Sequence, residues 1–232
     1  MIFMVFNLLK IMEIKNLYKS WGKMKMNINI PKKIIEFEKG WHKKIDFDQE
    51  ADELLNALNS AKKENDIQRY IKNNKKWFIP ASLFEEYDFG HHEAFIVPEQ
   101  ALGVDYRVDY MLLGKNSVGY HIVLAEFEDV NVDYKIKSAN METESVRKGL
   151  AQIKDWKRWI DSNKDYFMKS CGLSEISASI PTWGIRYCLV VGRRDRMDKI
   201  ANQMRRQSEL SGPHIVSYDR LVDNVRRLCN GF

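Results

Sequence analysis

The chain has 232 residues, of which 44% are hydrophobic and 12% aromatic, and its formal net charge is +5. This composition is ordinary for a globular protein with one sizeable domain. The three widely spaced cysteines contain no CxxC pair, which argues against a disulfide framework or a thiolate zinc site and for a reducing, cytoplasmic compartment. The apolar run MIFMVFNLL stops at Lys10, too early to span a bilayer, so no membrane association is expected.

Positive charge is concentrated at the two ends of the chain. Residues 1–48 carry ten lysines against five acids, and residues 184–232 carry ten basic residues against five acids. The middle carries 17 basic and 22 acidic residues. An acidic centre between basic ends is typical of a metal site that a polyanion approaches, although solvated charged faces are the alternative. We expect a Lys-rich N-terminal extension over residues 1–48 and a single domain over residues 49–232.

The first half of this domain predicts a helical segment and then a pair of strands. Apolar residues recur with helical spacing over about residues 48–74, until NNKKWFIP ends the pattern. Residues 94–98 predict a short strand, and residues 104–112 alternate with the period of two that is typical of a strand. GKNS, residues 114–117, predicts a turn, and YHIVLAEFE, residues 120–128, predicts the second strand of the pair.

The second half predicts helices alternating with buried strands. An apolar stripe over residues 143–160 predicts a helix, with Thr143 as a possible N-cap. The continuous apolar run at residues 184–192 predicts a buried strand. Helices over about residues 197–210 and 219–229 flank a short strand, HIVSY. This order predicts an α/β fold with a mixed sheet covered by helices on two sides.

Three acids lie near the ends of the central strand pair. Glu126 and Glu128 share a face, because side chains alternate along a strand, and they repel unless a cation lies between them. Asp109, Glu126 and the Phe127 carbonyl could supply oxygen ligands to Mg²⁺, with water completing the shell. The alternative is that Glu128 lies in a solvated loop and Asp109 only caps its strand.

The register of the strand pair bears on this metal site. A hairpin centred on Lys115–Asn116 places Asp109 opposite Ile122, roughly 13 Å along the strand from Glu126. Asp105 is then the nearer partner of Glu126. Asp109 serves only if the strands bend or change register, as bulges near active sites do.

Three segments together resemble the core of Shedu-type antiphage defence nucleases, in the PD-(D/E)XK superfamily. They are VPEQALGVDYRVDYMLL, YHIVLAEFE and ESVRKGLAQIKDW, and the upstream DIQRYIKNNKKWF resembles the lead-in helix of that family. The resemblance covers roughly residues 60–220. It implies a restriction-endonuclease-like core, a metal-dependent DNA endonuclease in antiphage or mobile-element defence, and a homo-oligomer, either a dimer or a tetramer.

The resemblance also implies roles for the acids. Asp109 and Glu126 would bind Mg²⁺ or Mn²⁺, which would polarise the scissile phosphate and acidify the attacking water. Glu128 stands where the family usually has a lysine, so it would act as a base or hold a second metal. Lys135 or Lys137 could supply a lysine from another place in the chain, although a solvated-loop role is the alternative for both.

Four further residues are weaker candidates for the site. Gln152 corresponds to the glutamine of the family on the helix after the core strands, where its amide could bond a phosphate oxygen or the water. Glu64, in the lead-in helix, is a weaker candidate for an additional acid. His91 and His92 have no second ligand pair at zinc spacing, so a loop role is expected.

Arg193, Arg194 and Arg196 follow the buried strand directly and precede a helix, a place where strand ends and helix N-termini favour phosphate. We therefore expect them to bind DNA phosphates, with ordinary surface arginines after a strand as the alternative. Two functions remain open at this stage. One is the metal-dependent endonuclease, and the other is a catalytically silent nuclease-like module that binds nucleic acid or assembles with partners.

Overall fold

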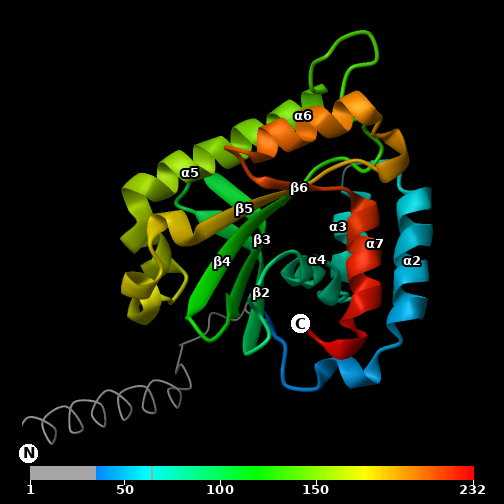
Figure 1. The fold of residues 1–232 in the computed structure, drawn as a ribbon. Coiled ribbons are helices and arrows are strands. Elements are labelled where there is room, and N and C mark those ends of the chain that lie inside the picture. Colours follow the sequence, from blue (N-terminus) through cyan, green and yellow to red (C-terminus); the bar gives the residue numbers. More distant parts are fainter. Residues whose placement is uncertain (1–34, 64) are drawn as a thin grey trace, which may run out of the picture. The chain divides into compact units, whose positions relative to one another are not determined.

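Residues 35–63 and 65–232 are described by the computed structural model, and they build a six-stranded mixed sheet with helices on both faces (Figure 1). They belong to one compact unit that spans residues 32–232. The predicted α/β class and mixed sheet are therefore confirmed. Most of the predicted Lys-rich extension lies outside the described residues.

The sheet has its strands in sequential order, from β1 at one edge to β6 at the other. Neighbours from β1 to β4 are antiparallel, whereas β4, β5 and β6 run parallel. The predicted strands are all present, and the strand predicted at residues 94–98 is longer than expected. The bounds are β1 (Ile35–Glu36), β2 (Glu93–Leu102), β3 (Tyr106–Lys115), β4 (Tyr120–Phe127), β5 (Ile185–Val190) and β6 (His214–Val216).

Six α-helices and six short 3₁₀ helices connect and cover the described strands. The α-helices are α2 (Phe47–Ser60), α3 (Asp66–Asn73), α4 (Phe78–Ala81), α5 (Glu144–Ser170), α6 (Lys199–Glu209) and α7 (Tyr218–Arg227). The 3₁₀ helices are η1 (Trp41–Lys44), η2 (Ser82–Glu86), η3 (Ser174–Ser179), η4 (Thr182–Gly184), η5 (Arg194–Arg196) and η6 (Leu228–Asn230).

The helical pattern predicted over residues 48–74 belongs to two helices rather than one. The Asp66 carboxylate accepts hydrogen bonds from the backbone N–H groups of Lys62 (2.8 Å) and Lys63 (2.9 Å). Such side-chain acceptors compete with helical hydrogen bonding, and here they stabilise a loop between α2 and α3. The two helices can therefore take different directions, and residues of α3 line a cleft that also contains Asp109.

The two faces of the sheet are buried by different helices. On β4, Val123, Ala125 and Phe127 belong to a core formed with α2, α4 and α7. The alternate residues of β4 therefore point to the other face, which α5 covers. Figure 1 shows α5 above the strands and the packed pair α2 and α7 at the right. The acid Glu126 alternates with Ala125 and Phe127, and it therefore lies on the α5 face.

Across the described part of the chain, no helix is long and apolar enough to cross a membrane.

Candidate active site

The hairpin that carries the acids has a different register from the one predicted. Lys115 pairs with Tyr120 and Tyr110 pairs with Ala125, so the turn comprises residues 116–119 and is centred two residues later than expected. The Asn116 side chain selects this turn, because its Oδ1 accepts hydrogen bonds from the N–H groups of Val118 (2.9 Å) and Gly119 (3.1 Å). The prediction that Asp109 lies opposite Ile122 is wrong.

The observed register brings Asp109 and Glu126 together. They are the next residues beyond the pair Tyr110–Ala125, one on each strand, and directly opposite residues of an antiparallel pair share a face. Asp109 Oδ2 also accepts a hydrogen bond of 2.8 Å from the Phe127 N–H, which ties the carboxylate to the end of β4. Asp105, the rival ligand, lies in the exposed turn between β2 and β3. No bend or bulge between β3 and β4 is needed.

Glu128 is buried, not solvated. Its side chain is 1% exposed, and its backbone N–H donates to the Val190 carbonyl at 2.9 Å, which continues the pairing of β4 with β5. The Glu128 carbonyl accepts a 2.7 Å hydrogen bond from the buried Tyr218 hydroxyl. Glu126 is also buried, at 7% exposure. The interpretation of Glu128 as a solvated loop acid is wrong, and the sheet therefore buries two carboxylates on one face.

A glycine in α5 makes room for Glu128. A Cβ at Gly149 would lie 2.9 Å from Glu128 Cγ and 2.6 Å from Leu189 Cδ1. Both distances are shorter than any side chain tolerates without movement of its neighbours. The absence of a side chain at this position lets α5 approach the sheet until the Glu128 carboxylate is enclosed between them.

The preceding residue, Lys148, brings a cation to the site. Lys148 Nζ lies 3.5 Å from Glu128 Oε1, and its side chain is 54% exposed. Lys135 Nζ instead lies 3.7 Å from Asp198 Oδ2, and the exposed Lys137 Nζ lies 3.8 Å from Asp133 Oδ2. The structure therefore joins Lys148 to Glu128, a pairing that sequence reasoning missed. The sequence places Lys148 in the segment ESVRKGLAQ, but it does not show that this lysine lies near Glu128 in the fold.

Gln152 follows Lys148 by four residues on α5 and is partly buried. Residues at this spacing are neighbours on a helix surface, so the Gln152 amide lies on the same side of α5 as Lys148. Its role at the site stays a prediction. Glu64 lies outside the described residues, and His91 and His92 lie in the loop before β2.

The carboxylates of the site contribute to raised pKa values of two neighbouring tyrosines. Burial raises the pKa of Tyr110, and the negative charges of Asp109 and Glu99 raise it further. Burial also raises the pKa of Tyr218 well above its usual value, and the charges of Asp109 and Glu128 add to this effect. Carboxylates that destabilise nearby tyrosinate anions attract a cation by the same field.

The donor set fits a hard divalent cation only in part. Asp109, Glu126 and the Phe127 carbonyl are oxygen ligands of the kind that Mg²⁺ and Mn²⁺ accept, and the hydrogen bond from the Phe127 N–H to Asp109 Oδ2 orients that carboxylate. Within residues 35–63 and 65–232, no group of three His, Cys, Asp or Glu side chains is arranged to hold a metal ion. A bound ion would therefore take its remaining ligands from water or phosphate.

The predicted DNA-binding arginines all have partners within the protein. Arg193 donates through Nε (3.0 Å) and Nη2 (2.9 Å) to Asp219 Oδ1, and its side chain is 14% exposed. Arg194 forms an ion pair with Asp223, and Arg196 donates to the Asn131 carbonyl at 2.6 Å.

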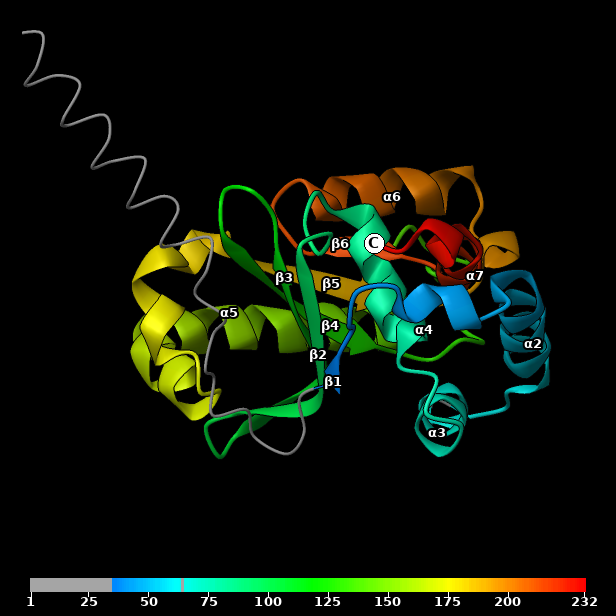
Figure 2. The same cartoon turned by 90° about the horizontal axis from the view of Figure 1, so that it is seen from below.

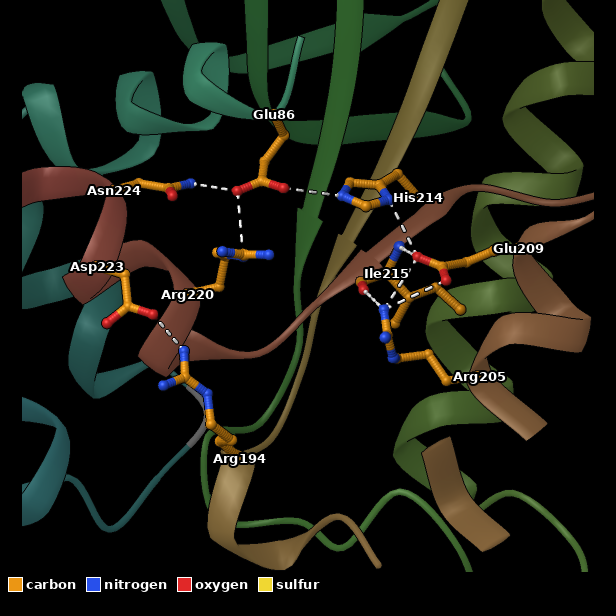
Figure 3. A network of polar contacts seen from close by, with 9 residues as sticks. All are labelled: Glu86, Arg194, Arg205, Glu209, His214, Ile215, Arg220, Asp223 and Asn224. Atoms are coloured by element: carbon orange, nitrogen blue, oxygen red, sulfur yellow. Dashed lines mark hydrogen bonds and ion pairs between the residues drawn. The ribbon is translucent and has the colours of Figure 1, made fainter. Parts of the chain in front are cut away.

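Figure 3 shows the ion pair of Arg194 within a wider network of paired charges. In this network Arg220 Nε lies 3.3 Å from Glu86 Oε1, and Arg205 Nη1 lies 3.2 Å from Glu209 Oε1. Much of the basic charge near the C-terminus is therefore paired with nearby carboxylates. Phosphate binding by Arg193, Arg194 and Arg196 stays a prediction.

The sequence matches one family of known proteins. A family model described as Shedu protein SduA, C-terminal, matches residues 61–222. A comparison with curated proteins finds no match. The matched range contains α3, all strands from β2 to β6 and the N-terminal half of α7, and it includes Asp109, Glu126 and Glu128.

Proposed function

Because this chain belongs to the family of the Shedu protein SduA C-terminal region, a family of antiphage defence proteins, we propose that it is a DNA endonuclease that uses Mg²⁺ or Mn²⁺. The proposal is carried by the buried carboxylates of Glu126 and Glu128, which flank Phe127 at the end of β4. The Phe127 N–H bonds Asp109 Oδ2 at 2.8 Å, and Lys148 Nζ lies 3.5 Å from Glu128 Oε1. Acids on adjoining strands with a nearby cation are suited to phosphodiester hydrolysis.

Each side chain has a proposed task. Asp109, Glu126 and the Phe127 carbonyl hold the divalent ion, and the Phe127 N–H keeps Asp109 in place. The bound ion supplies electrophilic activation of the phosphate and lowers the pKa of a water. Gln152 orients that water or a phosphate oxygen through its amide.

Glu128 and Lys148 act together in this proposal. The family resemblance implies a lysine at the position of Glu128, on the strand, whereas here the ammonium group comes from Lys148 on α5. Glu128 is then a positioning residue that holds Lys148 near the scissile phosphate, and Lys148 supplies positive charge to the transition state. The Lys148 side chain is 54% exposed, so it lies at the surface of the site.

Plasmid cleavage tests the proposal. The protein should cut DNA with Mg²⁺ or Mn²⁺ and not with EDTA, and Asp109→Asn and Glu126→Gln should each abolish cutting. Mn²⁺ titration by calorimetry provides a readout independent of activity, since both variants should lose the ion while circular dichroism shows the fold intact. Wild-type metal affinity in both variants would contradict the assignment.

A silent nuclease-like module is the second candidate, and the departure at Glu128 is the observation that favours it. Wild-type protein would then cut no DNA with any divalent ion, whereas Glu128→Lys, which restores the usual motif, would cut.

The roles of Arg193, Arg194 and Arg196 and the dimer or tetramer stay proposals. Replacing the three arginines by glutamine should lower the slope of log affinity against log salt by about 0.9 per phosphate contact on duplex DNA, and light scattering measures the oligomer.

A further inference from the structure

One face of α3 is polar and lines a cleft beside the proposed site. Gln68, Arg69 and Lys72 follow the spacing i, i+1 and i+4, which places them on adjoining parts of the helix surface, and all three line the cleft. The opposite face is anchored by Ile67 and Ile71, which are at most 1% exposed. The burial of those two residues holds α3 with its basic side toward the cleft.

The cleft has a volume of about 800 Å³ and reaches Asp109. Trp77, Pro98 and Tyr110 provide apolar wall, Arg69 and Lys72 provide positive charge, and Glu99 and Asp109 provide negative charge. Figure 2 looks almost along the axis of α3, which lies to the right of β1 and β2. A ligand in this cleft therefore contacts the basic side of α3 and reaches Asp109 at the same time.

The two cations of the cleft form ion pairs at the protein surface, and Arg69 Nε also donates to the Asn65 carbonyl at 3.3 Å. Arg69 Nη2 lies 2.8 Å from Asp66 Oδ1 with its side chain 60% exposed, and Lys72 Nζ lies 3.0 Å from Glu99 Oε1 with its side chain 63% exposed. Exposed pairs of this kind contribute little to stability, so either cation can exchange its carboxylate for a phosphate. Arg193 differs, because its largely buried guanidinium already makes several hydrogen bonds to Asp219.

We propose that this cleft binds a single strand of DNA next to the scissile phosphate. Arg69 and Lys72 pair with its phosphates, Gln68 donates its amide to a phosphate or sugar oxygen, and Trp77 packs against a base or sugar. A volume of about 800 Å³ is that of a small-ligand site, which suits a few nucleotides and not a duplex. Cationic grooves with an aromatic side chain are the usual means of holding single strands. The inference rests on the proposed function for the location of the scissile phosphate.

Binding measured in EDTA tests the cleft without any metal or cleavage. The probes are a fluorescein-labelled single-stranded oligonucleotide, a blunt duplex of the same sequence, and that duplex with a single-stranded overhang, followed by anisotropy across a salt series. Arg69→Gln with Lys72→Gln should reduce the slope of log affinity against log salt by about 1.4 on the single strand, which is about 0.7 for each lost phosphate contact. The overhang substrate should lose affinity likewise, and the blunt duplex should change less.

The control removes the same charge elsewhere. Arg158 pairs with Asp155 at the same i, i+3 spacing as Arg69 with Asp66, and it is 70% exposed. Arg158→Gln with Lys169→Gln should leave the slope near that of the wild type. Arg69→Lys with Lys72→Arg keeps both charges and should retain binding.

The outcomes separate this inference from the proposed function. If the double glutamine variant keeps wild-type affinity and slope, or if the blunt duplex loses as much as the single strand, the single-strand assignment is overturned, whatever the protein cuts. If the wild type cuts no DNA while single-strand binding depends on Arg69 and Lys72, the cleft stands and the nuclease proposal fails.

Discussion

Gly149→Ala should weaken the protein and disturb the proposed site at the same time. At most helical positions this change is stabilising by about 1 kcal/mol, because alanine loses less backbone entropy than glycine. In α5, however, the new Cβ would lie 2.6 Å from Leu189 Cδ1 and 2.9 Å from Glu128 Cγ. Overpacking of this kind typically costs about 1–3 kcal/mol. The net expectation is a destabilisation of about 0–2 kcal/mol.

Urea unfolding followed by circular dichroism measures the change, with a constant slope showing that only stability has altered. Ala151→Gly is the matched control, because Ala151 is an exposed residue of the same helix and reports the propensity term alone. It should lower the free energy of unfolding by about 1 kcal/mol. DNA cleavage should fall in Gly149→Ala, where Glu128 is displaced, and persist in Ala151→Gly.

One result would refute this reasoning. If Gly149→Ala gains the full 1 kcal/mol that propensity allows and cuts DNA like the wild type, α5 does not press on Glu128 as described. Leu189→Val in the Gly149→Ala background tells the two contacts apart. Recovery of stability without recovery of cleavage would show that the crowding of Glu128 is what affects the chemistry.

Lys148→Met should reduce cleavage by about 10²–10³ with Mn²⁺ affinity kept, whereas Lys148→Arg should retain most activity; equal cutting by Lys148→Met would remove Lys148 from the site. Burial acts to raise the pKa of Asp219, but hydrogen bonds and charge from Arg193 outweigh it and lower that pKa. The stabilisation by Asp219 is therefore complete above about pH 4 and is lost as the pH falls further, so Asp219→Asn should cost about 1–3 kcal/mol at pH 7 and less at pH 3 in urea titrations. Thiol titration of the native protein should modify Cys229 alone, because the other two cysteines are buried and burial raises their pKa values; rapid labelling of a second thiol would contradict that burial.

The strands and most of the helices follow from local patterns in the sequence. The alternation in residues 104–112 and the apolar run at 184–192 predict β3 and β5, because a half-buried and a fully buried strand impose different patterns on neighbouring residues. The apolar stripe from residue 143 predicts α5 for the same reason, although the helix extends to Ser170. The acids of the site could also be named from the sequence, since the residues that resemble the family include them.

The geometry among those elements needed the tertiary structure. Two hydrogen bonds to Asn116 Oδ1 shift the hairpin by two residues, and that shift decides whether Asp109 or Asp105 lies near Glu126. Moving the turn by two residues moves the partner of each strand residue by four. Nothing in the strand pattern distinguishes these registers, because an even shift keeps every side chain on its face.

The pairing of Lys148 with Glu128 depends on residues that are still further apart in the sequence. Lys148 and Glu128 are twenty residues apart, and they meet only because Gly149 allows α5 to approach the sheet closely. The charge of Arg193 is paired with that of Asp219, which lies 26 residues later in the sequence. Local sequence determined which segments are buried, because burial depends on the period of apolar residues. Which charges meet depends on how those buried faces pack, and only the folded chain decides that.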